Sequence, residues 1–198
     1  MLYNQTGRQV FQLDTTRLRL RALGKADVEH IFQLYSYEEV ARHLSRLPSP
    51  WSPGAAQDFV NDAQAALEQG AAYTIGMVQG ETETFIGVMA LRIPANDPSF
   101  SDAERAEDIG LGILGYSIAP PFWNRGYATE GAGRMIAFGF DELGLDRLQA
   151  TVLRTNTASR RVIERFGFAI EEAGIWEEPL CGGVARLADC YVLRRIRE

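Results

Sequence analysis

Apolar and polar residues follow two periods along this chain, one of two residues and one of three to four. In residues 17–22 the leucines alternate with arginines, which is the pattern of a strand with one buried and one wet face. In residues 25–35 the apolar side chains recur every three or four positions, which indicates an amphipathic helix. Helices and strands therefore alternate from the start of the chain, and we expect an α/β fold.

The same two patterns predict the remaining elements. Helices are expected at residues 38–44, 53–70 and 157–166. Strands are expected at residues 73–78, 84–93, 147–153, 168–172 and 189–196. Residues 94–108 follow neither pattern, so we expect one long irregular loop there, and such loops are usually mobile or functional.

The segment 109–142 predicts a strand, a stop at a Pro-Pro pair, a tight turn at residues 124–126 and then a helix with a small apolar face. In such a turn the first backbone N–H groups of the helix and the positive end of its dipole point outward, here beside Arg125. A helix N-terminus of this kind binds anions, and phosphates above all. Gly126 lets the backbone approach the anion closely. We therefore interpret the turn as a cradle for a pyrophosphate.

The strand in this segment also contains the letters of a dinucleotide-binding motif, G-x-G-x-x-G, at residues 110–115. That motif needs a helix directly after its third glycine. Here the strand continues to the two prolines, so no helix can begin, and a dinucleotide site is excluded. The glycines instead indicate a bulged strand that another backbone or a ligand approaches closely.

Length and composition are those of a soluble globular protein. At 198 residues, with 46% hydrophobic and 23% charged residues, we expect one domain spanning residues 1–198. No apolar run is long enough to cross a membrane and the N-terminus lacks the layout of a signal peptide, so we expect a cytoplasmic protein with no membrane partner. We expect Cys181 and Cys190 to be reduced. His30 and His43 have no ligands at metal-binding spacing, so no metal site is expected.

The formal net charge of −6 argues against nucleic acid as the main partner. The charge is unevenly spread, because residues 122–165 hold seven arginines and five acids, and the rest of the chain holds 13 basic and 21 acidic residues. This division suits a polyanionic cofactor in one half and a cationic substrate in the other. Charges that merely cover solvated faces account for it equally well. The sequence leaves open whether the chain forms a homodimer.

Three blocks of residues resemble the RimJ/RimL branch of the GNAT N-acetyltransferases. The run NRGYATE at 124–130 resembles the acyl-CoA signature (Q/R)-x-x-G-x-(G/A), NTASRRVIERFGF at 156–168 resembles the N-x-x-S…GF block, and TRLRLR at 16–21 resembles the opening strand of the branch. The resemblance implies a GNAT-like fold with a mixed central sheet flanked by helices, and acetyl-CoA as co-substrate. Trp123 stands where the signature has Gln or Arg, which removes a side chain but leaves the backbone cradle.

On this resemblance, acetyl-CoA binds to the end of the central strand, the turn and the start of the helix at 157. The expected cofactor-binding residues are Ile118, Asn124, Arg125, Gly126, Tyr127, Ala128, Thr129, Asn156 and Arg161. In the resembled branch the residue at Asn156 holds the pantetheine arm and the residue at Ser159 lies near the thioester sulfur. Both could instead merely cap the helix that follows them. Arg161 is expected on a cofactor phosphate, with a salt-bridged surface arginine as the alternative.

The implied reaction is attack of a neutral amine on the thioester carbonyl of acetyl-CoA. Many GNAT enzymes have a tyrosine where this chain has Ile163, so we expect Ser159, with Asn156 beside it, to donate a hydrogen bond to the leaving sulfur. Related enzymes often have a glutamate where this chain has Ile113. Glu107 and Asp108 are the candidate replacements, acting through water; the alternative is that they are acids of an exposed loop.

The missing base favours one class of acceptor. At pH 7, deprotonating a lysine of pKa about 10.4 costs about 4.6 kcal/mol, whereas an α-amine of pKa about 7.8 costs about 1.1 kcal/mol. We therefore expect an acetyl-CoA-dependent N-acetyltransferase whose acceptor is the N-terminal α-amine of a protein. The alternatives are an acetyltransferase of a small amine (a polyamine, an amino acid or an antibiotic) and a noncatalytic acyl-CoA-binding module.

Overall fold

The computed structural model describes residues 2–3, 9–44, 47, 50–177 and 186–196. Its centre is an eight-stranded sheet in the order β3-β4-β5-β6-β7-β8-β10-β9, and β1 and β2 form a separate two-stranded sheet. Every neighbouring pair in the large sheet is antiparallel except β7 and β8, which are parallel. The strands are β1 (Leu2–Tyr3), β2 (Gln9–Val10), β3 (Gln12–Asp14), β4 (Leu18–Ala22), β5 (Ala72–Gln79), β6 (Thr84–Arg92), β7 (Leu111–Ile118), β8 (Arg147–Leu153), β9 (Ala169–Glu177) and β10 (Arg186–Arg194).

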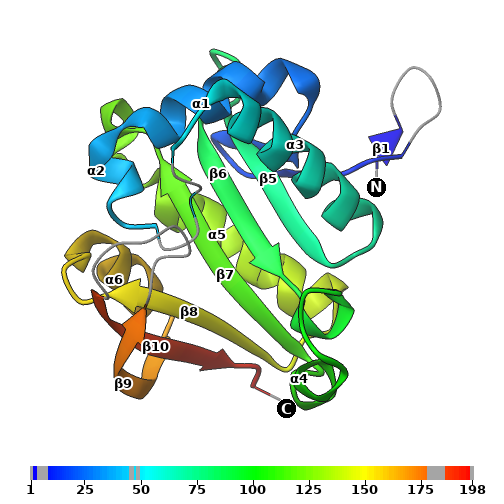
Figure 1. The fold of residues 1–198 in the computed structure, drawn as a ribbon, viewed down its shortest axis with the longest axis vertical. Coiled ribbons are helices and arrows are strands. Elements are labelled where there is room, and N and C mark those ends of the chain that lie inside the picture. The colour runs from blue at the N-terminus through cyan, green and yellow to red at the C-terminus, as the bar shows by residue number, and fades with distance from the viewer. Residues whose placement is uncertain (1, 4–8, 45–46, 48–49, 178–185, 197–198) are drawn as a thin grey trace.

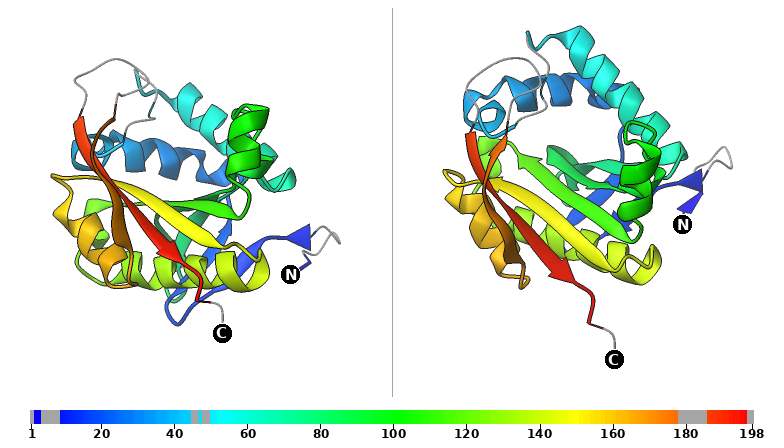
Figure 2. Two further views of the ribbon diagram at one scale, coloured as in Figure 1. Left: turned by 90° about the horizontal axis from the view of Figure 1, so that it is seen from below. Right: turned by 60° about the horizontal axis from the view of Figure 1, so that its bottom comes forward.

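Helices cover both faces of this sheet (Figures 1 and 2). α1 and α3 lie on one face, and α5 and α6 lie on the other. The helices are η1 (Lys25–Asp27), α1 (Val28–Ser36), α2 (Glu38–Ala41), α3 (Pro53–Glu68), η2 (Pro94–Asn96), α4 (Asp102–Glu107), η3 (Pro120–Phe122), α5 (Tyr127–Ala137), η4 (Phe138–Glu142, a π-helix) and α6 (Thr157–Glu164). The mixed sheet between helices confirms the expected α/β class.

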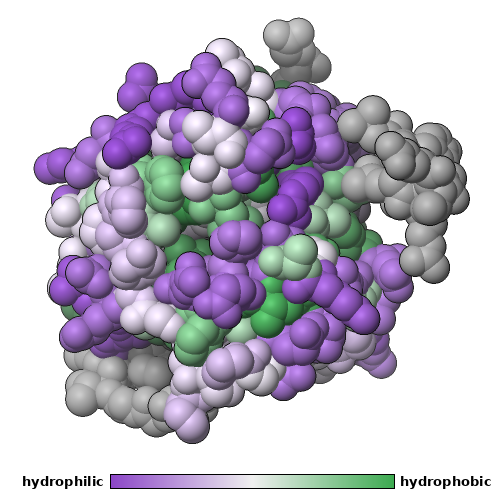
Figure 3. Space-filling view, turned by 90° about the horizontal axis from the view of Figure 1, so that it is seen from above, coloured by the Kyte–Doolittle hydropathy of each residue, from purple (hydrophilic) through white to green (hydrophobic). Residues whose placement is uncertain are grey.

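Two hydrophobic cores result from this layering. One packs α5 and α6 against the sheet and includes Met77, Met89 and Met135, all fully buried. The other packs α1 and α3 against the opposite face and includes Ile31 and Val60. Viewed from above, polar residues cover most of the surface and apolar residues show between them towards the middle (Figure 3). Within the described residues, no helix has the length and apolar character that crossing a bilayer requires.

Most of the expected elements are present, with shifted ends. The strand at 147–153 has the predicted bounds, whereas the strand expected at 168–172 extends to Glu177. The short strand β3 was not predicted. The prediction of one irregular loop at 94–108 was wrong, because that segment contains η2 and α4.

The glycines of β7 do not mark a bulge as expected. β7 pairs with β6 from Ile113 to Ile118 without a shift in register. Gly112 instead makes room for leucine side chains, since a Cβ there would lie 2.7 Å from Leu145 Cδ1 and 2.9 Å from Leu148 Cδ2. A strand in these positions confirms that the G-x-G-x-x-G letters are not a dinucleotide motif.

Candidate active site

β7 and β8 lie side by side at their first residues and then diverge (Figure 1). Their parallel pairing joins Leu111–Ile113 to Arg147–Gln149. β6 accompanies β7 as far as Ile118, and β10 accompanies β8 as far as Leu153, so each strand stays in the sheet on its outer side. A gap between the carboxyl ends of the two central strands is the result.

The free edge of β7 offers backbone groups to this gap. Successive residues of a strand direct their peptide groups to opposite sides. Ala119 donates its N–H to the Ile86 carbonyl on the β6 side, at 2.9 Å, so Tyr116 and Ile118 direct theirs into the gap. The indole of Trp123 donates to the Ile118 carbonyl from that side, at 2.6 Å. The Tyr116 and Ile118 N–H groups are therefore placed to bind an extended ligand.

The turn that follows β7 has the geometry of an anion site. Asn124 and Gly126 have left-handed backbones, with φ of 59° and 79°, a conformation that Gly and Asn adopt most readily. The first intrahelical bond of α5 runs from Glu130 N–H to the Gly126 carbonyl, at 3.0 Å. The N–H groups of residues 127–129 thus have no acceptor within the helix and are available to a ligand.

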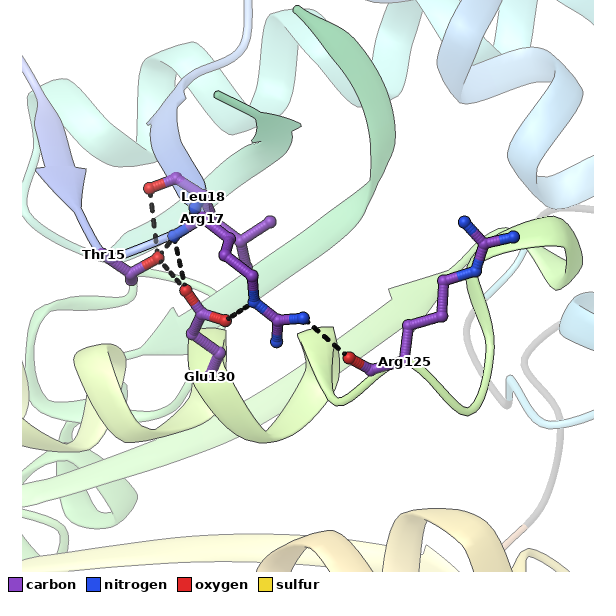
Figure 4. Close-up of polar contacts among 5 residues, drawn as sticks. All are labelled: Thr15, Arg17, Leu18, Arg125 and Glu130. Atoms are coloured by element: carbon purple, nitrogen blue, oxygen red, sulfur yellow. Dashed lines mark hydrogen bonds and ion pairs between the residues drawn. The ribbon is translucent and has the colours of Figure 1, made fainter. Parts of the chain in front are cut away.

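Glu130, in the first turn of α5, joins this turn to the start of β4 (Figure 4). Its Oε1 accepts hydrogen bonds from the Thr15 hydroxyl at 2.6 Å and from the Arg17 N–H at 2.8 Å, and its Oε2 accepts one from Arg17 Nε at 2.6 Å. Burial alone would raise the pKa of Glu130, but the hydrogen bonds from Thr15 and Arg17 hold it below its ordinary value. The carboxylate is therefore charged and holds Arg17 in place.

Arg17 in turn contacts three parts of the turn. Its Nη1 donates to the Arg125 carbonyl at 3.0 Å, and its guanidinium lies 4.6 Å from the centre of the Tyr127 ring. A Cβ on Gly126 would lie 3.4 Å from Arg17 Nη2. The Arg125 side chain points away from this cluster (Figure 4). Its guanidinium lies 5.7 Å from the centre of the Phe122 ring. The Arg17 guanidinium and a helix N-terminus thus meet at one turn, which fits a phosphate ligand.

The sequence interpretation missed Arg17 as a site residue. Its alternation with leucines indicated only the wet face of a strand, and its partner Glu130 lies 113 positions away. The turn itself, residues 124–129, lies where it was expected, at the junction of η3 and α5.

Ser159 and Tyr116 meet across the gap from opposite sides. The Tyr116 hydroxyl lies 2.9 Å from Ser159 Oγ and 3.1 Å from the Ser159 carbonyl oxygen. Asn156 is the N-cap of α6, and its Oδ1 accepts the Ser159 N–H at 3.1 Å. The capping role of Asn156 is therefore observed, and its side-chain NH₂ is not part of that bond. Nothing in the sequence pattern pointed to Tyr116 as the partner of Ser159.

Tyr116 stays protonated at this site. Burial raises the pKa of its hydroxyl to about 12, although the hydrogen bond with Ser159 opposes the rise. A neutral phenol donates one hydrogen bond and accepts others. When it donates to Ser159 Oγ, the serine hydrogen is free to point into the gap.

The structure separates the two candidate bases from this centre. Glu107 ends α4, and Asp108 lies beside Arg147 with a 3.4 Å contact, at the end where β7 and β8 are still paired. β7 begins at Leu111, after the turn that contains Asp108, and its five-residue rise from Leu111 to Tyr116 corresponds to about 17 Å. Arg161 lies on the exposed side of α6.

Among the described residues, no cluster of His, Cys, Asp and Glu is suited to a metal ion. His30 stacks on Phe85, with ring centres 5.2 Å apart. Cys190 is a buried free thiol, as expected, and Cys181 lies outside the described residues.

The family described as "Acetyltransferase (GNAT) domain" matches residues 17–169 of this chain. The chain belongs to the GNAT acetyltransferase family. The match contains the divergent strands, the turn and the Tyr116–Ser159 contact. The GNAT chain is also 31% identical over 159 residues to the uncharacterized N-acetyltransferase YoaA of Bacillus subtilis (strain 168), covering 80% of this chain and 83% of that protein.

Solved structures show the same fold. RimL, a ribosomal L7/L12 alpha-N-protein acetyltransferase, superposes with a TM-score of 0.76 at 18% identity, over 95% of this chain and 96% of that chain. Spermidine N-acetyltransferase from Vibrio cholerae, in complex with CoA and spermine, superposes with a TM-score of 0.71 at 18% identity, over 91% and 96%. RimL is thus among the structural neighbours that share this fold. This GNAT protein is an acetyl-CoA-dependent N-acetyltransferase.

Proposed function

We propose that this GNAT enzyme transfers the acetyl group of acetyl-CoA to a primary amine, with the N-terminal α-amine of a protein as the leading acceptor. The observation that carries the proposal is the gap between β7 and β8, which has the turn at one side and Ser159 at the other. A single extended ligand lying in that gap would reach both. Acetyl-CoA has this layout, with a diphosphate at one end and a thioester at the other.

The proposed roles of the binding residues follow from their placement. The N–H groups of residues 127–129, the backbone of Asn124 to Gly126 and the guanidinium of Arg17 bind the diphosphate. The N–H of Ile118 and the side-chain NH₂ of Asn156 bind the pantetheine arm. Arg161 is proposed for an outlying phosphate, because it is exposed on the helix that borders the gap.

The acetyl-transfer step assigns roles to Tyr116 and Ser159. The neutral amine attacks the thioester carbonyl, a C–N bond forms, the C–S bond breaks, and the proton from nitrogen ends on the thiol or in solvent. The Tyr116 N–H directed into the gap is placed to stabilise the oxyanion. Ser159 donates its hydrogen to the departing sulfur. This requires that the Tyr116 hydroxyl turns its hydrogen from the Ser159 carbonyl oxygen, at 3.1 Å, to Ser159 Oγ, at 2.9 Å.

The acceptor must arrive without a strong side-chain base. Glu107 and Asp108 lie at the paired end of the strands, so the proposed mechanism does not use them. An α-amine needs only about 1.1 kcal/mol to lose its proton at pH 7. This supports an N-terminal amine over a lysine side chain.

The proposal is tested by incubating the protein with acetyl-CoA and a panel of peptides, amino acids and polyamines, with mass spectrometry of the products and detection of free thiol. We expect acetylated α-amines and stoichiometric thiol release. Acetylation confined to polyamines would show that the protein is an acetyltransferase of small amines and not of protein N-termini. Stabilisation by CoA with no acetylated product across the panel would show a noncatalytic acyl-CoA-binding module.

A Gly126→Glu variant is the control for the cofactor site. A glutamate there must adopt a left-handed backbone and places a carboxylate beside the expected phosphates. We expect CoA binding to be lost in calorimetry. Unchanged CoA affinity would remove the turn from the cofactor site.

A further inference from the structure

A cavity of about 430 Å³ lies beside the open end of the gap and is lined by Arg42, His43, Thr155 and Arg186. Three separate segments build it. Arg42 and His43 follow α2, Thr155 follows β8, and Arg186 begins β10. The Arg154 N–H donates to the Leu187 carbonyl at 3.0 Å, which holds the segment after β8 beside the start of β10.

The cavity adjoins the proposed reaction centre. Thr155 directly precedes Asn156, whose Oδ1 caps α6 at Ser159. Ser159 is the residue that contacts Tyr116 across the gap. A molecule in the cavity therefore sits next to the place where the thioester is expected.

Arg42 has no ion pair with an acid among the described side chains, and Arg186 lies opposite Glu177 in the pairing of β10 with β9. Arg186 donates to the carbonyls of Arg42 and Leu44, the latter at 2.9 Å, and these oxygens carry no formal charge. Among the described arginines, ten each contact an Asp or Glu, and Arg42 and Arg186 are two of the six for which no ion pair is described. Among the described residues, Arg186 Nε and His43 Nδ1 are also buried without a hydrogen-bond partner. Positive charge without a counter-ion is typical of a site for an anion.

The same charge assists the chemistry of the proposed function. A nearby like charge disfavours the protonated form of an amine and so lowers its pKa. The cavity shows this effect on its own histidine: burial lowers the pKa of His43, and Arg42 and Arg186 lower it further. An acceptor amine held here would be neutral at a lower pH than in water, which a mechanism without a side-chain base requires.

We infer that the acceptor carries a carboxylate close to its amine and that Arg42 and Arg186 bind this carboxylate in the cavity beside Thr155. The inference rests on the proposed function and narrows its substrate class. It disfavours polyamines, because the arginines of the cavity repel a second ammonium group. The carboxylate can come from a free amino acid or from an acidic side chain next to a protein N-terminus, and the test has an arm for each.

The first experiment compares matched acceptors that differ in one charge. One pair is an amino acid and its amide, and the other is a peptide with Asp or Asn in its second position. In one of the two pairs, we expect kcat/KM to be at least about tenfold higher for the carboxylate member. That pair identifies whether the carboxylate belongs to a free amino acid or to an acidic side chain next to a protein N-terminus. Equal use of both members in both pairs, or a preference for spermidine, would overturn the inference.

The second experiment uses Arg42→Gln, because Arg42 is exposed and no described side chain depends on it. We expect kcat/KM to fall about tenfold for the carboxylate acceptor and clearly less for the amide acceptor, with unchanged KM for acetyl-CoA. Arg195→Gln, an exposed arginine at the paired end of the strands, is the control and should leave both acceptors unaffected. A variant Arg42→Gln that keeps the preference would overturn the assignment.

A binding measurement separates this inference from the proposed function. Succinate has two carboxylates and no amine, and we expect it to bind to the CoA-saturated protein in calorimetry and to lose that binding in Arg42→Gln. If no amine in the panel is acetylated but succinate binds through Arg42, the proposed function fails and the anion site stands. If succinate does not bind to the wild type, the anion site is refuted whatever the enzyme acetylates.

Discussion

Arg17 shows how one side chain can position a cofactor turn that lies far from it in the sequence. It donates to Glu130 and to the Arg125 carbonyl, and it covers the ring of Tyr127. Arg17→Gln would remove a positive charge from the turn and leave Glu130 without its counter-ion. We expect the affinity for CoA to fall about tenfold, which corresponds to about 1.4 kcal/mol. Calorimetric titration with CoA measures this.

Arg19→Gln is the matched control for that variant. Arg19 lies two residues further along the chain, in β4, and its partner Glu83 is in the turn between β5 and β6. The two variants lose the same charge, and each loses one ion pair of a partly exposed arginine. CoA affinity should therefore be unchanged in Arg19→Gln, and an equal loss in both would show a general effect of charge and not a role for Arg17.

Ser159 is the second residue whose contacts predict a kinetic effect. Its hydroxyl lies 2.9 Å from that of Tyr116, and the proposed function has it donate to the leaving sulfur. Such a group acts only as the C–S bond breaks, so Ser159→Ala should lower kcat on the order of a hundredfold with little change in the KM of acetyl-CoA. Tyr116→Phe should lower kcat less, because it removes only the partner of the serine.

Steady-state kinetics on both variants check this prediction. Thr157→Ala is the control, since Thr157 is exposed in the first turn of the same helix. Because burial raises the pKa of Tyr116 to about 12, the activity should not follow a tyrosine ionisation below about pH 10. A wild-type rate in Ser159→Ala would exclude the serine from the mechanism.

At the scale of the elements, the site depends on how closely β6 approaches the end of β7. A Cβ on Gly87 would lie 2.2 Å from the Ser117 carbonyl oxygen and 3.0 Å from Ile118 Cα, and both are backbone atoms that cannot move alone. Gly87→Ala should therefore push the strands apart where β7 enters the cofactor site. We expect a loss of about 1–3 kcal/mol in the free energy of unfolding, together with weaker CoA binding.

Urea unfolding measures the loss, and Gly115→Ala is the matched control. A Cβ on Gly115, in β7 itself, would meet nothing within 4 Å. This variant should keep its stability to within about 0.5–1 kcal/mol, since alanine also restricts the unfolded chain. If the two variants unfold alike, then the close approach at Gly87 does not limit the packing of these strands.

The elements that could be predicted are those that bury a face. β8 alternates buried and half-buried residues along its length, and its bounds were predicted correctly. α4 was missed because it has no buried residue and so no apolar period. The start of α4 nevertheless has the sequence of a capping box, with Ser101 followed three residues later by Glu104. In the structure Ser101 Oγ accepts from Glu104 N–H, and the Glu104 carboxylate accepts from Ser101 N–H.

For the whole molecule, features formed by consecutive residues could be predicted from the sequence, whereas contacts between residues that the sheet brings together could not. The turn at 124–129 is continuous in the chain, so its glycine and the start of the helix after it could be recognised from the sequence. The contact of Tyr116 with Ser159 spans 43 positions, and that of Arg17 with Glu130 spans 113. These contacts follow from strand order and from the divergence of β7 and β8, and neither property has a periodic signature.

Acidic side chains also join distant parts of the molecule, and their titration predicts how its stability depends on pH. Hydrogen bonds and nearby arginines hold the pKa below its ordinary value for Asp27, Asp97, Glu130 and Asp189. Asp27 is only 2% exposed and accepts from Arg21 at 2.7 and 2.8 Å and from Gly24 N–H, which outweighs the effect of burial. Each of these groups binds protons more tightly in the unfolded chain than in the folded one.

The stabilisation from such groups is complete above the unfolded pKa of about 4 and is lost as the pH falls through the lower folded values. We therefore expect the free energy of unfolding, measured with urea, to be level from pH 6 to 8 and to fall below about pH 4. Asp27→Asn should cost about 1–3 kcal/mol at pH 7 and should flatten the acid limb, because one of the titrating groups is gone. Asp62→Asn, at an exposed position of α3, should reproduce the wild-type curve. An acid limb as steep in Asp27→Asn as in the wild type would mean that the pair with Arg21 does not link protonation to folding.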